Sequence, residues 1–255
     1  MPVTGCEAYQ VVSAGLMLAL PGLALALVAD RLEQNPLIGF RVGYTFTSRE
    51  AWVKANRVSG VVLAATGLAA MAVGLVWGFM ACVIALVVLP LVALPLLVSY
   101  ASRTAEKALI GEEQPLEPPA GELPRPRYPV LAAVVPILGL AACAMAAAGL
   151  LEEGMPAAAV VVGLEPFAAL YLAYLSLARP EAYHQPWLEP GEVAWLATLV
   201  PVSAGLASMA SAALVAGYAA AGAALLALSL AHALAAAWIT MRAYTQRQRR
   251  ATQPR

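Results

Sequence analysis

Long stretches without a charged side chain constrain the fold of this chain more than any other feature. Arg57 and Arg103 enclose 45 uncharged residues, and Glu192 and Arg242 enclose 49 more that carry no full charge. A helix rises about 1.5 Å per residue and a bilayer core is about 30 Å thick, so each stretch is long enough to cross a membrane twice. The sequence therefore predicts two helical hairpins embedded in lipid.

The remaining apolar segments extend this prediction to an all-α, polytopic membrane protein with seven transmembrane helices. The composition agrees, because 62% of the residues are hydrophobic and only 12% are charged, about half the charged share of a soluble domain. The expected spans are Val11–Ala29, Val58–Val76, Phe79–Val98, Tyr128–Leu151, Ala157–Ala178, Val193–Val215 and Ala219–Met241. Prolines inside these spans are expected to kink them, namely Pro21, Pro90, Pro95, Pro136, Pro166 and Pro201.

Basic residues sort to one side of the membrane when the chain is threaded in this way. The gaps 1–10, 77–78, 152–156 and 216–218 contain no Lys or Arg, so all 15 basic residues fall on the opposite side. By the positive-inside rule, the N-terminus is outside and the C-terminus is cytoplasmic. We therefore expect a multi-pass protein of the cell membrane.

A Pro- and Glu-rich segment divides the chain into modules. We expect a three-helix module at 1–107, a cytoplasmic linker at 108–127 and a four-helix module with a basic cytoplasmic tail at 128–255. This is a 3+1+3 layout in which the fourth span is a connector. The two triplets show a weak similarity that either reflects a degenerate parallel repeat or is coincidental.

The first cytoplasmic loop, residues 31–57, leads into the second span. Thr47 and Glu50 fit a capping box, with Thr47 as the N-cap and Glu50 at N3. Trp52 is expected at the depth of the membrane interface, with Lys54 and Arg57 among the headgroups. These features predict a capped, basic helix that enters the membrane.

Residues 35–60 also carry a longer pattern of nine residues at fixed spacing. Its members are Asn35, Gly39, Arg41, Thr45, Ser48, Trp52, Asn56, Arg57 and Gly60. This signature resembles that of the SdpI family of integral membrane proteins. The resemblance implies a protein that gives immunity to a membrane-active peptide and signals its presence by holding a transcriptional regulator at the membrane. We therefore expect loop 31–57 to contact a cytoplasmic partner.

Two ionisable residues are expected deep inside the second module. Glu165 lies within the fifth span, and His232 lies near the middle of the seventh at a comparable depth. An acid at mid-bilayer costs about 2.5–3.5 kcal/mol and should face a partner inside the bundle, for which His232 is the candidate. Such a pair relays protons or binds a cation, or it is a single structural hydrogen bond.

Two hypotheses for the function are compatible with the sequence. The first is an SdpI-like protein of binding, signalling or immunity, and the second is a small secondary transporter that uses Glu165 and His232. The sequence contains no hydrolase or metalloprotease motif, so we expect no enzyme, no catalytic residues and no cofactor. We also expect no metal site and no nucleic-acid partner, because the three cysteines (Cys6, Cys82 and Cys143) are widely separated and no nucleic-acid module is visible. The bilayer itself is the expected partner of the spans.

Overall fold

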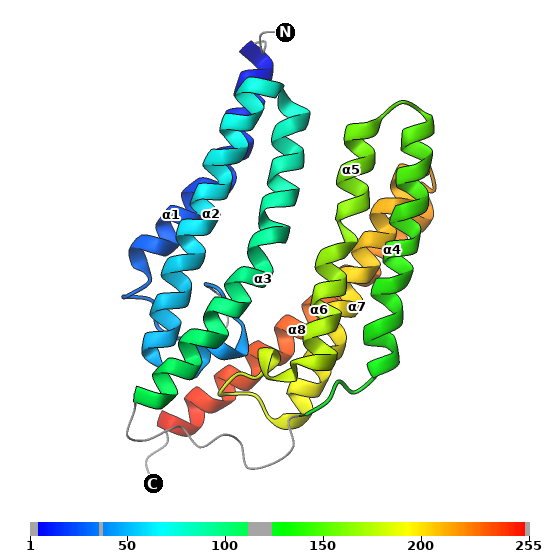
Figure 1. Ribbon diagram of the computed structural model, residues 1–255. Coiled ribbons are helices and arrows are strands. Elements are labelled where there is room, and N and C mark those ends of the chain that lie inside the picture. Colours follow the sequence, from blue (N-terminus) through cyan, green and yellow to red (C-terminus); the bar gives the residue numbers. More distant parts are fainter. Residues whose placement is uncertain (1–4, 36–37, 112–123, 253–255) are drawn as a thin grey trace. The chain divides into compact units, whose positions relative to one another are not determined.

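The computed structural model describes residues 5–35, 38–111 and 124–252 and is helical throughout the elements that it contains (Figure 1). Seven helical segments are long and apolar enough to cross a membrane, which confirms the predicted number of spans. The elements are α1 (Gly5–Val28), η1 (Gly43–Phe46), α2 (Arg49–Trp77), α3 (Phe79–Gly111), α4 (Pro129–Glu152), α5 (Pro156–Leu164), α6 (Pro166–Ala178), η2 (Pro180–Tyr183), α7 (Pro190–Val215) and α8 (Ala219–Thr252).

The chain divides into two compact units, Met1–Leu116 and Glu117–Arg255, which are treated separately below. Helix α3 continues to Gly111, into the segment expected to form the linker. Linker residues 112–123 lie outside the described part of the chain, as do residues 253–255 of the basic tail. Each unit is thus a helical bundle with its own internal contacts.

Large apolar side chains cover the outside of the helices, as a membrane-embedded protein requires. Met17 on α1, Leu96 on α3 and Leu234 on α8 are each at least two-thirds exposed. In water such an apolar surface would be unfavourable, but in a bilayer these side chains contact lipid. The protein is therefore a multi-pass membrane protein.

Glycines bring α1 and α2 into backbone contact in the first unit. A Cβ atom on Gly22 would lie 2.5 Å from the backbone nitrogen of Ala64, and one on Gly60 would lie 2.5 Å from that of Ala26. Gly67 is equally close to the Gly15 carbonyl, with its Cβ at 2.5 Å. Small residues spaced along both helices are the usual means of close helix packing in membranes. The signature glycine at 60 is part of this interface.

The tight turn between α2 and α3 is held by the start of α1. Gly78 has a φ of +93°, a conformation that favours glycine. The Phe79 backbone N–H donates to Glu7 Oε1 at 2.9 Å, so Glu7 satisfies an amide at the N-terminus of α3. Below this contact, Val11, Ala70 and Cys82 form a buried cluster that joins all three helices.

Helix α7 is central in the second unit, where α4, α6 and α8 pack against it. Gly205 allows the close approach of α4, because a Cβ there would lie 2.7 Å from the backbone nitrogen of Pro136. Ser203 and Ser229 tie α7 to α8, since each hydroxyl donates to the other residue's carbonyl at 2.9 Å. These contacts place the polar groups of α7 inside the bundle.

Pro166 perturbs the fifth span without ending it. Glu165 lies between α5, which ends at Leu164, and α6, which begins at Pro166, but it keeps a helical backbone (φ −52°, ψ −43°) and its N–H donates to the Val161 carbonyl at 3.2 Å. The other prolines expected to kink spans lie inside continuous helices: Pro21, Pro90, Pro95, Pro136 and Pro201. The fifth span therefore runs from Pro156 to Ala178, with the Glu165 carboxyl group inside it.

Candidate functional site

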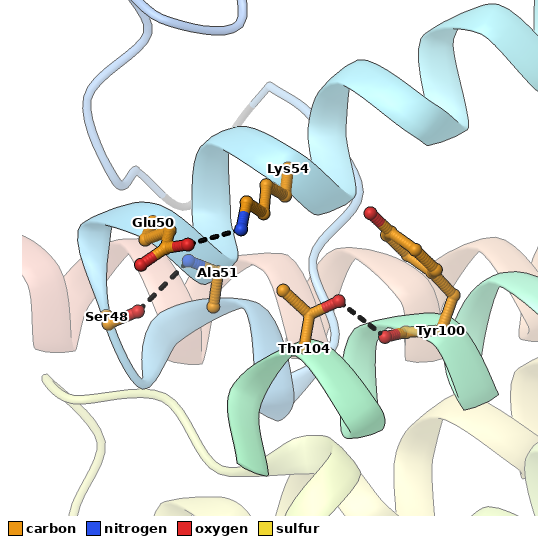
Figure 2. Close-up of polar contacts among 6 residues, drawn as sticks. All are labelled: Ser48, Glu50, Ala51, Lys54, Tyr100 and Thr104. Atoms are coloured by element: carbon orange, nitrogen blue, oxygen red, sulfur yellow. Dashed lines mark hydrogen bonds and ion pairs between the residues drawn. The ribbon is translucent and has the colours of Figure 1, made fainter. Parts of the chain in front are cut away.

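Within the signature segment, Ser48 lies at the N-terminus of α2. Ser48 is the N-cap residue, and its hydroxyl accepts a hydrogen bond from the Ala51 N–H at 3.0 Å (Figure 2). The expected capping box is therefore wrong by one residue, because Thr47 instead donates to the Tyr44 carbonyl at 2.9 Å and closes the η1 turn. Glu50 forms an ion pair with Lys54 one turn further along the helix. Ser48, a signature residue, thus fixes where α2 starts.

Asn56 joins the loop to the body of α2. Its side chain is fully buried, its Oδ1 accepts the Phe40 N–H at 2.6 Å, and its Nδ2 donates to the Trp52 carbonyl at 2.9 Å. Gly39 passes directly over this amide with a φ of +108°, and a Cβ there would lie 2.2 Å from Oδ1. The loop backbone crosses the Asn56 amide so closely that position 39 has no room for a side chain. This explains why the signature contains both a glycine and an asparagine.

Trp52 packs against the loop and holds it through a hydrogen bond and a ring contact. It is completely buried, its Nε1–H donates to the Leu32 carbonyl at 2.8 Å, and its ring lies 5.1 Å from that of Phe46. The depth of Trp52 at the membrane interface stays a prediction, and the structure adds that the side chain packs inside the protein. A buried indole with a satisfied N–H and an aromatic neighbour is a strong local core.

The end of α1 is tied to the start of α2 by two arginines. Arg49 donates to the carbonyls of Asp30 and Leu32, and Arg57 forms an ion pair with the Asp30 carboxylate. Cations at a helix C-terminus satisfy its last carbonyl groups. Arg49 lies outside the nine-residue pattern, and sequence reasoning missed it. Arg49 reaches the end of α1 only because the loop folds back, and the position of Arg49 beside the N-cap was the only signal in the sequence.

The remaining signature residues shape the loop backbone. Asn35 Oδ1 accepts the Ile38 N–H at 2.8 Å, which forms a local turn, and the buried Thr45 hydroxyl donates to the Val42 carbonyl at 2.8 Å. Arg41 differs from these residues because its side chain is exposed. Most of the signature thus builds the loop, while Arg41 is exposed on the same loop as the apolar Ile38, which is 57% exposed.

The intramembrane pair expected in the second unit is not brought together. The Glu165 carboxyl group lies near Ser211 on α7, and His232 Nδ1 lies 2.8 Å from the Leu228 carbonyl of its own helix. Within the described part of this unit, neither α5 nor α6 packs against α8, because α7 lies between them. Glu165 and His232 therefore do not form one site.

Groups of three or more metal-ligating side chains are absent from the described ranges. The cysteines with described side chains, Cys82 and Cys143, are both buried and free.

Residues 31–100 match the SdpI/YfhL protein family, which confirms the resemblance suggested by the nine signature residues. The matched segment covers the loop, α2 and most of α3, and the similarity to the family is shown for this part of the chain. No curated protein and no solved structure matches the chain.

Proposed function

We propose that this SdpI-like membrane protein uses loop 31–57 as a preformed docking surface for a cytoplasmic partner, in a response to a membrane-active peptide. The observation that carries the proposal is that buried polar side chains of the signature hold the loop in one conformation, on which Arg41 and Ile38 are exposed.

A loop held in one conformation binds a partner with a smaller loss of conformational entropy than a flexible loop does. A loop that exposes both a cation and an apolar side chain suits a partner that offers a carboxylate and an apolar group. The positive-inside rule predicts that this surface faces the cytoplasm. These points favour a docking surface for a regulatory protein.

Site-specific photocrosslinking in cells tests the docking surface. A photoreactive amino acid replaces Ile38, and the matched control replaces Val92 on α3, which is 60% exposed on a lipid-facing helix. We expect a discrete protein adduct from position 38 that is lost when Arg41→Ala is added, and no such adduct from position 92. Adducts of equal yield from both positions would contradict the proposal.

Survival assays test the immunity part of the proposal. Cells with and without the protein are exposed to a panel of synthetic cationic amphipathic peptides. Protection is expected from the unaltered chain and from Arg103→Ala, a control at another exposed arginine, and reduced protection is expected from Arg41→Ala. Equal survival with and without the protein across the panel argues against immunity.

Secondary transport is a second candidate because of the carboxyl group of Glu165 inside the fifth span. Ionisable side chains within membrane spans often mark ion or proton pathways, and Glu165 lies near Ser211 on α7. Transport predicts that Glu165→Gln stops flux in proteoliposomes, whereas docking through the loop predicts that the same change leaves photocrosslinking at position 38 intact. The two outcomes separate the candidates.

A further inference from the structure

A cavity opens in the second unit at the end where α4 and α7 terminate. Helices α4 and α8 both pack against α7 but, within the described residues, not against each other. The space between them forms a cavity of about 500 Å³, lined by α4, α7, the α7–α8 turn and α8. Alanines on the facing surfaces keep it open, including Ala146 on α4 and Ala213 on α7. Cavities of this size hold small organic ligands.

The lining of this cavity combines apolar walls with a single charge. Met145 and Met209 add polarizable, adaptable surface to the alanine walls. Glu153 is the one ionisable carboxylate among the lining residues, and Tyr218, which is 68% exposed, adds an aromatic ring. A carboxylate and an aromatic ring both attract a cation, and the apolar walls attract an apolar body.

The charge around the cavity reinforces this chemistry. The two turns at this end, residues 152–156 and 216–218, contain no Lys or Arg, and Glu152 adds a second negative charge beside Glu153. A cation that reaches this end therefore meets negative charge without a competing basic side chain from either turn. By the positive-inside rule, this end is expected to face outside.

We propose that this cavity binds a lipophilic monovalent cation, with the apolar body between α4, α7 and α8 and the positive charge beside Glu153 and Tyr218. The site lies entirely within the second unit, so it is independent of loop 31–57 and of the function proposed for that loop. A lipid acyl chain is the competing occupant, and it differs because it gains nothing from the Glu153 charge.

Equilibrium binding of radiolabelled tetraphenylphosphonium to the purified, detergent-solubilised full chain tests the proposal. We expect saturable binding that weakens about fivefold in Glu153→Gln, the upper range for one exposed charge pair. Glu152→Gln is the matched control, because it removes the neighbouring exposed carboxylate outside the cavity lining, and it should weaken binding clearly less than Glu153→Gln does. Ala213→Leu, which fills the cavity, should weaken binding at unaltered Glu153.

Competition experiments separate a cation site from a generally apolar one. Methyltriphenylphosphonium should displace the probe, whereas neutral triphenylphosphine should not. Thermal unfolding of each variant in the same detergent shows whether it is folded, and Arg41→Ala should bind the probe like the unaltered chain whatever its effect on docking. The proposal is overturned if binding is not saturable, if Glu152→Gln and Glu153→Gln weaken it equally, or if the neutral phosphine competes as well as the cation.

Discussion

The contact between Gly39 and Asn56 predicts a specific non-additivity between two substitutions. Asn56→Ala removes the acceptor of the Phe40 N–H, and leaving such a group unpaired costs about 1–3 kcal/mol. Gly39→Ala puts a side chain on a residue with a φ of +108° and places its Cβ 2.2 Å from the Asn56 Oδ1. The backbone conformation alone costs about 1–3 kcal/mol, and the clash adds to it.

The two penalties in Gly39→Ala differ in their dependence on Asn56. When Asn56→Ala is present, the clash disappears and only the backbone penalty remains. We therefore expect the double variant to be more stable than the sum of the single changes predicts, by about 1–3 kcal/mol, the range found for residues in direct contact.

Hydrogen–deuterium exchange of peptides that cover residues 38–48 measures this effect, because it reports the free energy of opening the loop. The measurement uses the full chain in detergent and compares the unaltered protein, both single variants and the double variant. Gly191→Ala is the control, since a Cβ there meets nothing within 4 Å and the expected change is small. A Gly39→Ala penalty that is the same with and without Asn56 would refute the packing of the loop over this amide.

Three further predictions concern other parts of the structure. Gly60→Ala should lower the unfolding temperature of the first unit in detergent, because its Cβ would press on the α1 backbone; an unchanged temperature would contradict the close packing of α1 and α2. Glu7→Ala should destabilise the same unit by about 1 kcal/mol through loss of the acceptor for the Phe79 N–H, and Glu7→Gln should keep most of that stability. Burial lowers the pKa of His184, so its proton binds more tightly in the unfolded chain; stability should fall as the pH drops below about 6.5, and His184→Gln should reduce that dependence.

The number of spans and the position of the signature segment could be predicted from the sequence, since both rest on local properties. A membrane crossing needs about 20 apolar residues, so the 45 uncharged residues after Arg57 predict two crossings joined by a turn. The nine signature residues were recognisable by spacing alone, without knowledge of what each one contacts.

The errors in the sequence prediction arise where tertiary contacts decide between local alternatives. Thr47 and Ser48 are both good N-cap residues, and only the η1 turn, which uses the Thr47 hydroxyl, leaves Ser48 to cap α2. The burial of Trp52 also depends on a tertiary contact, because the folded-back loop covers it. Glu165 and His232 lie at similar predicted depths, but depth does not determine which helices are neighbours, and α7 separates them.

The central claim is that the signature folds loop 31–57 into a fixed surface exposed to the cytoplasm. Its most direct test is maleimide labelling of Ile38→Cys in a chain whose three native cysteines are replaced by alanine. A membrane-impermeant maleimide should react rapidly with the thiol at position 38 in inside-out vesicles and not in intact cells. Labelling from outside intact cells, or no labelling from either side, would contradict the claim.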